Sequence, residues 1–368
     1  MKIAIYYDVP AGGASRTMEE EIGLLRVKNE VVIFHNLPAT LNPPFLTRLF
    51  ADLESIFFQR FKQQFQAYKI DQGKFDVVYV SHDRHSQAPW ILRFLKTPTV
   101  FLCQEPTRAY FEEFLCINPR LPIINRIYET INRYLRKKIE IKNASFAKKI
   151  VANSIYSTES IFRAYGLISA PIYLGVDNKE YFPDSKVKKN QILVVGNYEP
   201  QKALIFAIEV VSKIDLKFRP KLVVTSPRDV DSSELKRLAK KFKISLGLLV
   251  GLTQNELRRV YSQSKLTLAV AYLEPFGLSV IESLACGTPV VAAREGGFKE
   301  TIIHQKTGLL VERDAVKIAM EMQSLINNPD KLLLMGKAGI IDVNKRFSWQ
   351  QNVDQLETIF HETSHHYR

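Results

Sequence analysis

Two glutamates eight residues apart are the pair in this chain whose spacing points most clearly to chemistry. They bound the segment Glu-Pro-Phe-Gly-Leu-Ser-Val-Ile-Glu, which runs from Glu274 to Glu282. Pro275 and Gly277 are typical of a loop, and the apolar residues that follow have the spacing of a helix packed on a sheet. We therefore expect Glu274 at the carboxyl end of a strand and Glu282 about two helical turns further on.

The start of this helix is a predicted anion site. The backbone N–H groups of its first turn, near Gly277, Leu278 and Ser279, lack partners within the helix and carry the positive end of its dipole. Such groups bind phosphate, and the two flanking carboxylates can accept hydrogen bonds from sugar hydroxyls. The segment therefore predicts a site for a nucleotide diphosphate sugar.

The segment from Glu274 to Glu282 resembles the E-x7-E signature of the retaining, GT-B-fold glycosyltransferases that use nucleotide sugars (family 4-like, also called glycosyl transferases group 1). Other segments resemble further elements of the same family, in the same order along the chain. They are residues 174–177 with 182–183, 195–202, 296–300 with 308–311, and 347–349. The resemblance therefore extends over nearly the whole chain.

The resemblance implies an α/β fold of the GT-B type, with two Rossmann-like domains and a cleft between them. Residues 1–180 are the expected acceptor-binding domain, 181–348 the nucleotide-sugar donor domain, and 349–368 a helix that packs back on the N-terminal domain. Alternating strand and helix patterns in the sequence also predict open parallel sheets. The expected strands are residues 2–7, 30–34, 76–80, 99–103, 149–153, 191–195, 221–225, 245–250, 266–270 and 288–292.

Lys202 is the residue that the resemblance places against the leaving diphosphate, where a fixed positive charge stabilises the negative charge that develops. In the same loop, Asn197 stands where the family has an arginine. An amide donates hydrogen bonds without bringing a charge. We therefore expect either weaker donor binding or compensation by another cation.

Residues 101–108 resemble an element in which mannosyltransferases of the family carry a histidine beside the donor sugar. Here that position is Gln104, and Arg108 follows it. Glutamine can exchange hydrogen bonds with a hydroxyl, but it cannot act as an acid or base. His82 and His85 end another expected strand and are expected to face the same crevice, although a histidine at a strand end is usually structural.

Two glycines follow the first expected strand. Gly12 and Gly13 allow the backbone to approach a ligand closely, unless they simply form a strand–helix turn. Arg16 opens the next helix and is a candidate contact for phosphate or acceptor.

The residues and the resemblance together predict transfer of a hexosyl group from a nucleotide diphosphate sugar to a hydroxyl, with retention at the anomeric carbon. The predicted catalytic residues are Glu274, Lys202, Gln104 and His82, and Glu282 is expected to bind the ribose. No metal and no cofactor besides the nucleotide sugar are expected, because lysine and the helix dipole supply positive charge. GDP-mannose is the first expectation for the donor. A UDP-sugar transferase with a soluble acceptor and a GT-B binding protein without activity are the alternatives.

The net charge of +13 over 368 residues favours anionic partners. No nucleic-acid recognition motif accompanies this charge, so no nucleic acid is expected as a partner. Residues 125–149 are the densest basic stretch, and the apolar residues Ile127, Ile131, Tyr134, Leu135 and Ile139 recur there near helical spacing. This pattern predicts an amphipathic helix against an anionic membrane surface, or alternatively a solvated helix face over the N-terminal core.

The expected location is cytoplasmic and peripheral, at the inner face of the cell membrane, with a lipid-linked or cell-envelope saccharide as the acceptor. No apolar run reaches the length of a membrane span, and the three cysteines show no metal or disulfide pattern. The aromatic-rich residues 41–68 are expected to form a helix packed on the domain. An acceptor-binding or lipid-facing surface is the alternative interpretation of that stretch.

Overall fold

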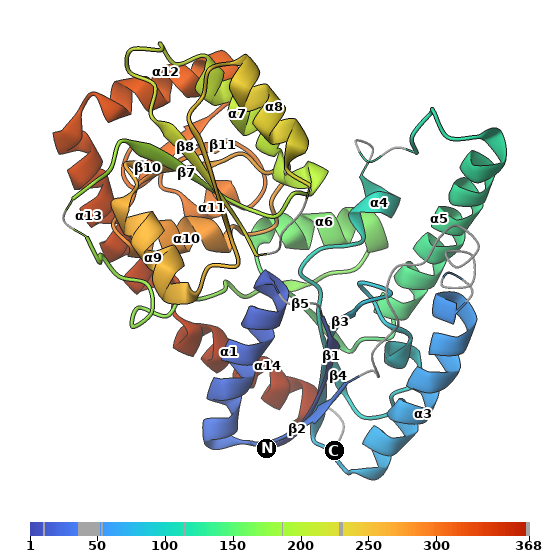
Figure 1. The fold of residues 1–368 in the computed structure, drawn as a ribbon. Coiled ribbons are helices and arrows are strands. Elements are labelled where there is room, and N and C mark those ends of the chain that lie inside the picture. The colour runs from blue at the N-terminus through green and yellow to red at the C-terminus, as the bar shows by residue number, and fades with distance from the viewer. Residues whose placement is uncertain are drawn as a thin grey trace. The chain divides into compact units, whose positions relative to one another are not determined.

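The computed structural model describes residues 1–9, 12–35, 52, 54–112, 115, 117–185, 187–227 and 231–365. The chain divides into two compact units (Figure 1). The N-terminal unit contains Met1–Ile172 and Asn352–Arg368, and the C-terminal unit contains Tyr173–Gln351. The boundaries expected at residues 180 and 348 differ from these divisions by eight and three residues, respectively.

The N-terminal unit is built on a parallel six-stranded sheet in the order β2-β1-β3-β4-β5-β6. Its strands are β1 Lys2–Asp8, β2 Glu30–Phe34, β3 Val77–Asp83, β4 Thr99–Leu102, β5 Lys149–Ala152 and β6 Ala170–Pro171. Its helices are α1 Gly13–Lys28, α3 Gln59–Gln72, α4 Arg108–Phe111, α5 Ile123–Ala144, α6 Ile155–Tyr165 and α14 Trp349–His365, with short helical turns η1 Glu54–Phe58 and η2 Trp90–Arg93. Residues 41–51 and 53 of the expected aromatic-rich helix lie outside the described residues, and the rest of that stretch is helical.

The last helix, α14, packs on this sheet, as the resemblance implies. Val353, Leu356 and Phe360 lie in the same buried cluster as the residues of β1 and β3 that face them. The ring of Phe360 meets the ring of Tyr79 edge to face at 5.3 Å between centroids. The end of the chain therefore stabilises the core of its first unit by apolar burial.

The C-terminal unit has a second parallel six-stranded sheet, in the order β12-β11-β10-β7-β8-β9. Its strands are β7 Gln191–Val195, β8 Lys221–Ser226, β9 Leu246–Val250, β10 Leu266–Ala269, β11 Val290–Ala293 and β12 Gly308–Val311. Its helices are α7 Leu204–Ser212, α8 Ser233–Lys241, α9 Gln254–Gln263, α10 Leu278–Ala285, α11 Phe298–Thr301, α12 Ala315–Ile326 and α13 Pro329–Arg346, with the turn η4 Pro200–Lys202.

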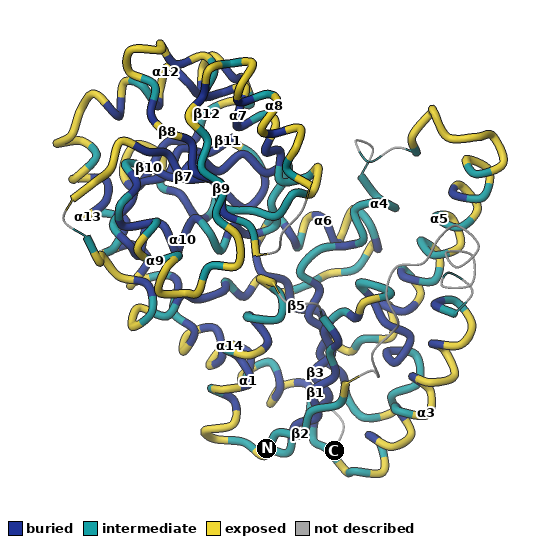
Figure 2. The backbone as a smooth tube through the Cα atoms, viewed as in Figure 1, coloured by how far each residue is buried: buried dark blue, intermediate teal, exposed yellow. Residues whose placement is uncertain are grey.

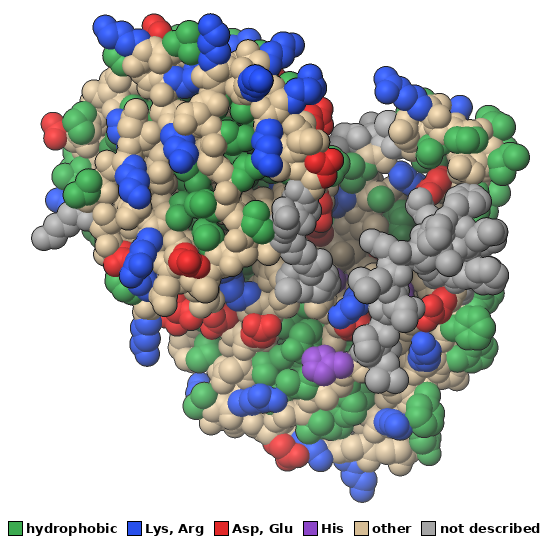
Figure 3. Space-filling model, viewed as in Figure 1, with side chains coloured by type: hydrophobic (Ala, Val, Ile, Leu, Met, Phe, Trp, Pro, Cys, Tyr) green, Lys and Arg blue, Asp and Glu red, His purple; other side chains and the backbone are tan. Residues whose placement is uncertain are grey.

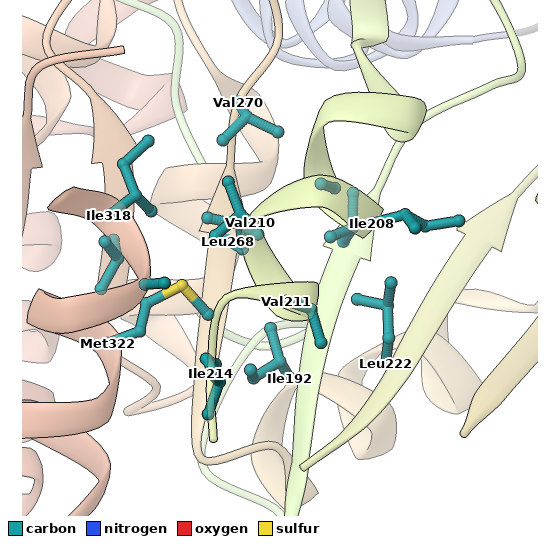
Figure 4. Packing of buried hydrophobic residues seen from close by; sticks show 14 of the residues in the cluster. Ile192, Ile208, Val210, Val211, Ile214, Leu222, Leu268, Val270, Ile318 and Met322 are labelled. Atoms are coloured by element: carbon teal, nitrogen blue, oxygen red, sulfur yellow. The ribbon is translucent and has the colours of Figure 1, made fainter. Parts of the chain in front are cut away.

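Apolar strands and amphipathic helices produce the burial that the sequence patterns predict. Figure 2 shows the central strands of both sheets buried and the outer faces of most helices exposed. The edge strands β2, β6 and β9 are partly or fully exposed. Figure 4 shows how α7, α12 and the strands contribute side chains to one cluster. The labelled side chains are Ile192, Ile208, Val210, Val211, Ile214, Leu222, Leu268, Val270, Ile318 and Met322.

Two strands were not expected from the sequence. The short strand β6 has only two residues, and β12 coincides with residues 308–311, which resemble a family element. Cys103 and Cys286 are free and buried, and Cys116 lies outside the described residues. Within the described part of the chain, no helix combines the length and the apolar character needed to cross a bilayer.

Candidate functional site

The order of strands in the C-terminal unit locates the candidate site. The chain builds β7, β8 and β9 in one direction from the middle of the sheet, and then β10, β11 and β12 in the other. β7 and β10 are therefore neighbours at the point where the order reverses, and ligands of open α/β sheets bind beyond the carboxyl ends of such strands. The loop after β7 carries Asn197 and Lys202, and the loop after β10 carries Glu274.

Lys202 and Glu274 meet as an ion pair at this point. The ammonium Nζ lies 2.8 Å from Oε2 and 3.1 Å from Oε1 of the carboxylate, and both side chains are largely but not fully buried. Gly196 makes room for the lysine, because a Cβ at that position would lie 3.3 Å from Cβ and Cγ of Lys202. The structure thus brings together the two residues that the sequence assigned to phosphate and sugar.

Two consecutive glycines hold the loop that carries Glu274. Gly296 has φ of +57°, and a Cβ there would lie 2.5 Å from the carbonyl oxygen of Glu274. A Cβ on Gly297 would lie 2.4 Å from the carbonyl oxygen of Pro275, and the Gly297 N–H donates to the Glu274 oxygen at 2.7 Å. The glycine pair at the start of the family-like segment 296–300 therefore allows a backbone contact that sets the position of Glu274.

We expect Gly296→Ala to lower stability and donor turnover together, because the methyl group collides with the Glu274 backbone. Gly166→Ala is the matched control, since Gly166 has φ of +71° with nothing within 4 Å of a Cβ. In the control, the free energy of unfolding should fall only by about 1–2 kcal/mol, because alanine disfavours the left-handed conformation. In urea unfolding, the free energy of unfolding of Gly296→Ala should be at least about 2 kcal/mol lower than that of the control. Equal losses in the two variants would contradict the close-contact argument.

Arg313 and Glu295 fix the start of the same loop, and sequence reasoning missed both. The Glu295 carboxylate pairs with the guanidinium of Arg313 and accepts from the N–H of Leu273 at 3.3 Å. The two terminal nitrogens of Arg313 donate to the carbonyls of Val270 and Ala271, each at 3.0 Å. No local spacing marks this group, because the partners of Arg313 lie 18 to 43 residues away along the chain.

The helix after the loop, α10, presents its N-terminus as expected. Its N-cap residue Gly277 has φ of +100°, and a Cβ there would approach the ring of Phe298 to 3.0 Å. The N–H groups of Leu278 and Ser279 occupy its first turn, where a helix offers no internal acceptor. The first turn of α10 therefore has the geometry of the predicted diphosphate site.

Glu282 lies deeper than expected for a residue that binds ribose. Its side chain is buried inside the unit, and it accepts a hydrogen bond from the hydroxyl of Tyr261 on α9 at 2.8 Å. Burial, and then the negative charge of Glu282, raise the pKa of Tyr261 well above its ordinary value. Glu282 therefore has a structural partner, and its contact with ribose stays a prediction.

The two positions that depart from the family pattern carry buried polar atoms without partners. Within the described residues, Oδ1 of Asn197 and Nε2 of Gln104 are buried and make no hydrogen bond. A buried polar atom left unsatisfied costs about 1–3 kcal/mol. The N-terminal and C-terminal units thus each contain an amide that a ligand group would satisfy.

The N-terminal sheet has its own reversal of strand order, between β1 and β3. Arg84 after β3 pairs with Asp8 at the end of β1, at 3.0 Å between Nε and Oδ1. Next to Arg84, the buried carboxylate of Asp83 accepts from the backbone N–H of His85 and the side chain of Gln63. This end of the sheet is therefore tightly ordered around two carboxylates.

His82 lacks the charge that would bind a phosphate. Desolvation lowers the pKa of His82 to about 4, so its imidazole is neutral at pH 7. The backbone of His85 belongs to the turn that Asp83 holds. A neutral ring exchanges hydrogen bonds with a hydroxyl but brings no charge to a phosphate.

The glycine segment after β1 begins a helix. Gly12 is the N-cap of α1 with an extended backbone, and its N–H donates to the hydroxyl of Ser15 at 3.0 Å. Gly13 and Arg16 lie in the first turn of α1. The strand–helix turn is therefore observed, and their contact with a ligand stays a prediction.

The loop after β4 is held by a carboxylate from α5. Glu140, buried, accepts from the N–H and the hydroxyl of Thr107 at 2.9 and 2.6 Å. Arg108 lies next in the chain, and its guanidinium is 3.6 Å from Glu105. Gln104 and Arg108 therefore flank a loop whose backbone position is fixed by the helix below it.

Comparison with known proteins agrees with this geometry. Residues 177–341 match the family model described as Glycosyl transferases group 1. This part of the chain belongs to that family. The match contains Lys202, Glu274, Glu282 and the glycine pair, and so covers the site at the reversal between β7 and β10.

Curated proteins that are similar in sequence are also named as glycosyltransferases. A D-inositol 3-phosphate glycosyltransferase of Segniliparus rotundus is 40% identical over 102 residues, which are 27% of this chain and 22% of that protein. A protein of the same name from Rhodococcus jostii is 28% identical over 235 residues, 56% of this chain and 51% of its own. The chain thus spans about half the length, or less, of the curated relatives it matches.

Solved structures match over the whole chain. Sucrose-phosphate synthase from Thermosynechococcus elongatus is 18% identical, with a TM-score of 0.74 and 98% of both chains covered. The Anabaena protein HepE, solved with UDP and glucose, is 16% identical with a TM-score of 0.74, over 98% of this chain and 100% of its own. The fold is therefore GT-B, and the predicted fold class is confirmed.

Proposed function

We propose that this protein transfers a hexosyl group from a nucleotide diphosphate sugar to a hydroxyl. The ion pair of Lys202 with Glu274 at the strand reversal carries the proposal. In such a donor, the bond that breaks joins the sugar to the diphosphate. A cation for phosphate and a carboxylate for sugar hydroxyls must therefore lie within a few ångströms of each other, and the distance of 2.8 Å meets this requirement.

Each residue has a distinct task in this proposal. The ammonium of Lys202 and the N–H groups of Leu278 and Ser279 bind the diphosphate and stabilise its charge as it leaves. Glu274 then accepts hydrogen bonds from hydroxyls of the donor sugar, and Glu282 accepts from the ribose. These positive groups are in place before reaction, so little reorganisation is needed when charge develops.

Retention follows from the family resemblance, with the departing phosphate taking the proton of the acceptor hydroxyl. Neither Gln104 nor the neutral His82 needs to act as a base in that scheme. Their proposed task is to exchange hydrogen bonds with the donor or acceptor. A donor-hydrolysis assay tests the reaction directly, because a binding protein without activity would release no nucleotide from any nucleotide sugar.

GDP-mannose remains our first choice of donor, because residues 103–108 come nearest to the mannosyltransferase version of that element. A UDP sugar is the alternative, and the Anabaena structures contain UDP. For the acceptor we propose a saccharide, lipid-linked or of the cell envelope, used at the cytoplasmic face of the membrane. The curated relatives are named for a phosphorylated cyclitol acceptor, which makes a soluble phosphorylated acceptor the alternative.

We expect GDP to raise the thermal unfolding temperature and UDP to leave it unchanged. A ligand that binds only the native state adds about 2.7 kcal/mol of stability at a concentration of 100 times its Kd. Thermal unfolding at increasing GDP, UDP and, as a control, adenosine diphosphate provides the measurement. A response to UDP alone would replace GDP-mannose by a UDP sugar, and no response to either would contradict the proposed function.

Donor turnover should survive a strong chelator. Within the described residues, no group of three or more histidine, cysteine or acidic side chains is arranged to hold a metal ion. Lys202 and the α10 N-terminus supply the positive charge that a divalent ion provides in other transferases. Turnover measured before and after EDTA tests this expectation. A complete loss that Mg²⁺ or Mn²⁺ restores would contradict it.

A further inference from the structure

The long helix α5 turns its apolar side to solvent and its polar side to the protein. Its fully or nearly buried side chains include Glu129, Glu140 and Asn143. Ile139 and Ile141 are partly buried, whereas six of its other large apolar side chains are 46–73% exposed. They are Ile123, Ile124, Ile127, Ile131, Tyr134 and Leu135. The alternative interpretation of this stretch, a solvated helix face with its apolar residues over the N-terminal core, is therefore wrong for these six side chains.

Specific hydrogen bonds fix this orientation. The carboxylate of Asp52 accepts from Tyr128, Asn132 and Arg136, which follow one another at four-residue intervals along one side of α5. Further along the same side, Glu140 accepts from Tyr165 at 2.6 Å. A helix rotated to bury its isoleucines would leave these polar groups without partners, at about 1–3 kcal/mol each.

The neighbouring helical segment, η1 followed by α3, has the same inverted arrangement. Gln59 and Gln63 are buried, and Gln63 bonds both Asp83 and the N–H of Ile91. The aromatic side chains on the opposite side are 57–66% exposed. They are Phe57, Phe58, Phe61, Phe65 and Tyr68. Both α3 and α5 pack against η2, so the two exposed faces belong to one region of the N-terminal unit.

We call these eleven exposed side chains, together with the charged residues among them, the α3–α5 surface. Figure 3 shows hydrophobic side chains over α5 and α3, with lysines and arginines between them. Both carboxylates of α5 are buried, so its exposed charges are all positive: Arg126, Lys138 and Lys142. On α3 the exposed charges are Arg60, Lys62 and Lys69.

We propose that the α3–α5 surface binds an anionic lipid bilayer, with its aromatic and aliphatic side chains among the acyl chains and its cations at the headgroups. Large apolar side chains that gather on two neighbouring helices and face the solvent mark an interaction site. Positive charge at its edges matches anionic lipid, whereas a second copy of this chain would bring like charges together. Nucleic acid would match the charge but offers nothing to the isoleucines of α5.

This inference adds to the proposed function a surface that would bring the enzyme to a lipid-linked acceptor. The proposed function explains why the enzyme would bind a membrane, but the binding proposal itself does not depend on the enzyme's activity. The binding itself is measured without any sugar, so a failure of either proposal can be told from a failure of the other.

Vesicle flotation tests the apolar contribution. Wild-type protein should float with vesicles of phosphatidylcholine and phosphatidylglycerol and remain unbound with phosphatidylcholine alone. The double substitution Ile127→Ser and Ile131→Ser should lower the bound fraction at least about tenfold, because two exposed apolar side chains leave the lipid. Leu333→Ser with Leu334→Ser on α13 is the matched control, since those side chains are 58% and 66% exposed but lie in the other unit.

Charge reversal tests the electrostatic contribution. Lys138→Glu with Lys142→Glu should lower binding to anionic vesicles about tenfold or more at low salt, and the difference should shrink at high salt. Donor hydrolysis should be unchanged in all of these variants. No binding of wild type to anionic vesicles, or equal binding by the Ile127/Ile131 variant, would overturn the proposal. So would a concentration-dependent dimer that the same substitutions abolish.

A tryptophan introduced on α3 as a fluorescent probe tests whether this helix enters the lipid. The native tryptophans Trp90 and Trp349 are buried, so they contribute a constant background. Phe65→Trp should show blue-shifted emission with anionic vesicles, and brominated acyl chains should quench it. Unshifted and unquenched emission in vesicle-bound protein would remove α3 from the proposed surface.

Discussion

Replacing Lys202 with methionine should lower donor turnover at least tenfold, which corresponds to about 1.4 kcal/mol or more of lost stabilisation. Methionine keeps much of the alkyl chain that lies beside Gly196 but removes the charge that would meet the diphosphate. It also leaves Glu274 without the ammonium that lies 2.8 Å away. Donor hydrolysis, followed as kcat/KM, and calorimetric binding of the nucleotide measure the two consequences.

Lys306→Met is the control for this substitution, because Lys306 is an exposed lysine of the same unit outside the site. Glu282→Gln should also lower turnover at least tenfold if the carboxylate binds ribose. Glutamine keeps an acceptor for the hydroxyl of Tyr261, so the fold is preserved while the charge is lost. If the Lys202→Met variant binds and turns over the donor as well as the Lys306→Met variant does, the donor site lies elsewhere.

Replacing Arg313 with methionine should destabilise the protein by about 2–4 kcal/mol. The substitution leaves the mostly buried carboxylate of Glu295 without its cation and two backbone carbonyls without their donors. It also removes the stacking of the guanidinium on the ring of Tyr272, 4.0 Å from its centroid. Urea unfolding at pH 7 measures the loss. Turnover should fall as well, because Leu273 directly precedes Glu274.

Lys317→Met provides the matched control for the Arg313 substitution. Lys317 also pairs with a glutamate, Glu312, but both side chains are more than half exposed to solvent. An exposed pair of this kind contributes about 0–1 kcal/mol. If the two variants unfold at the same urea concentration, the Arg313–Glu295 pair does not hold the loop in the way described.

Most of the fold could be read from the sequence. Short apolar segments punctuated by glycine and proline predict buried parallel strands, and those at residues 30–34 and 191–195 match the structure to the residue. Helix α6 begins at Ile155 because Ser154, before it, caps the helix by accepting from the N–H of Ser157. Such local rules succeed because strand burial and helix capping depend on neighbours in the chain.

Part of the candidate site was also predictable. Glu274 and Lys202 lie 72 residues apart in sequence, yet both follow strands that end at the same edge of one sheet. The family resemblance assigned both residues to one site before any coordinates were known, and the order of strands explains why they meet. The supporting group of Arg313 and Glu295 could not be found in this way, because its contacts are to backbone carbonyls that carry no sequence signature.

Tertiary structure alone decided which way the amphipathic segments face. The spacing of Ile127, Ile131 and Leu135 determined that α5 has an apolar side, and nothing in that spacing says whether the side meets a core or the solvent. Hydrogen bonds with Asp52 and Thr107 hold the polar side of α5 against the protein. Asp52 is 76 residues from its partner Tyr128, and Thr107 is 33 residues from its partner Glu140. Periodicity is a property of one helix, whereas its rotation is set by the polar groups of other segments that it must satisfy.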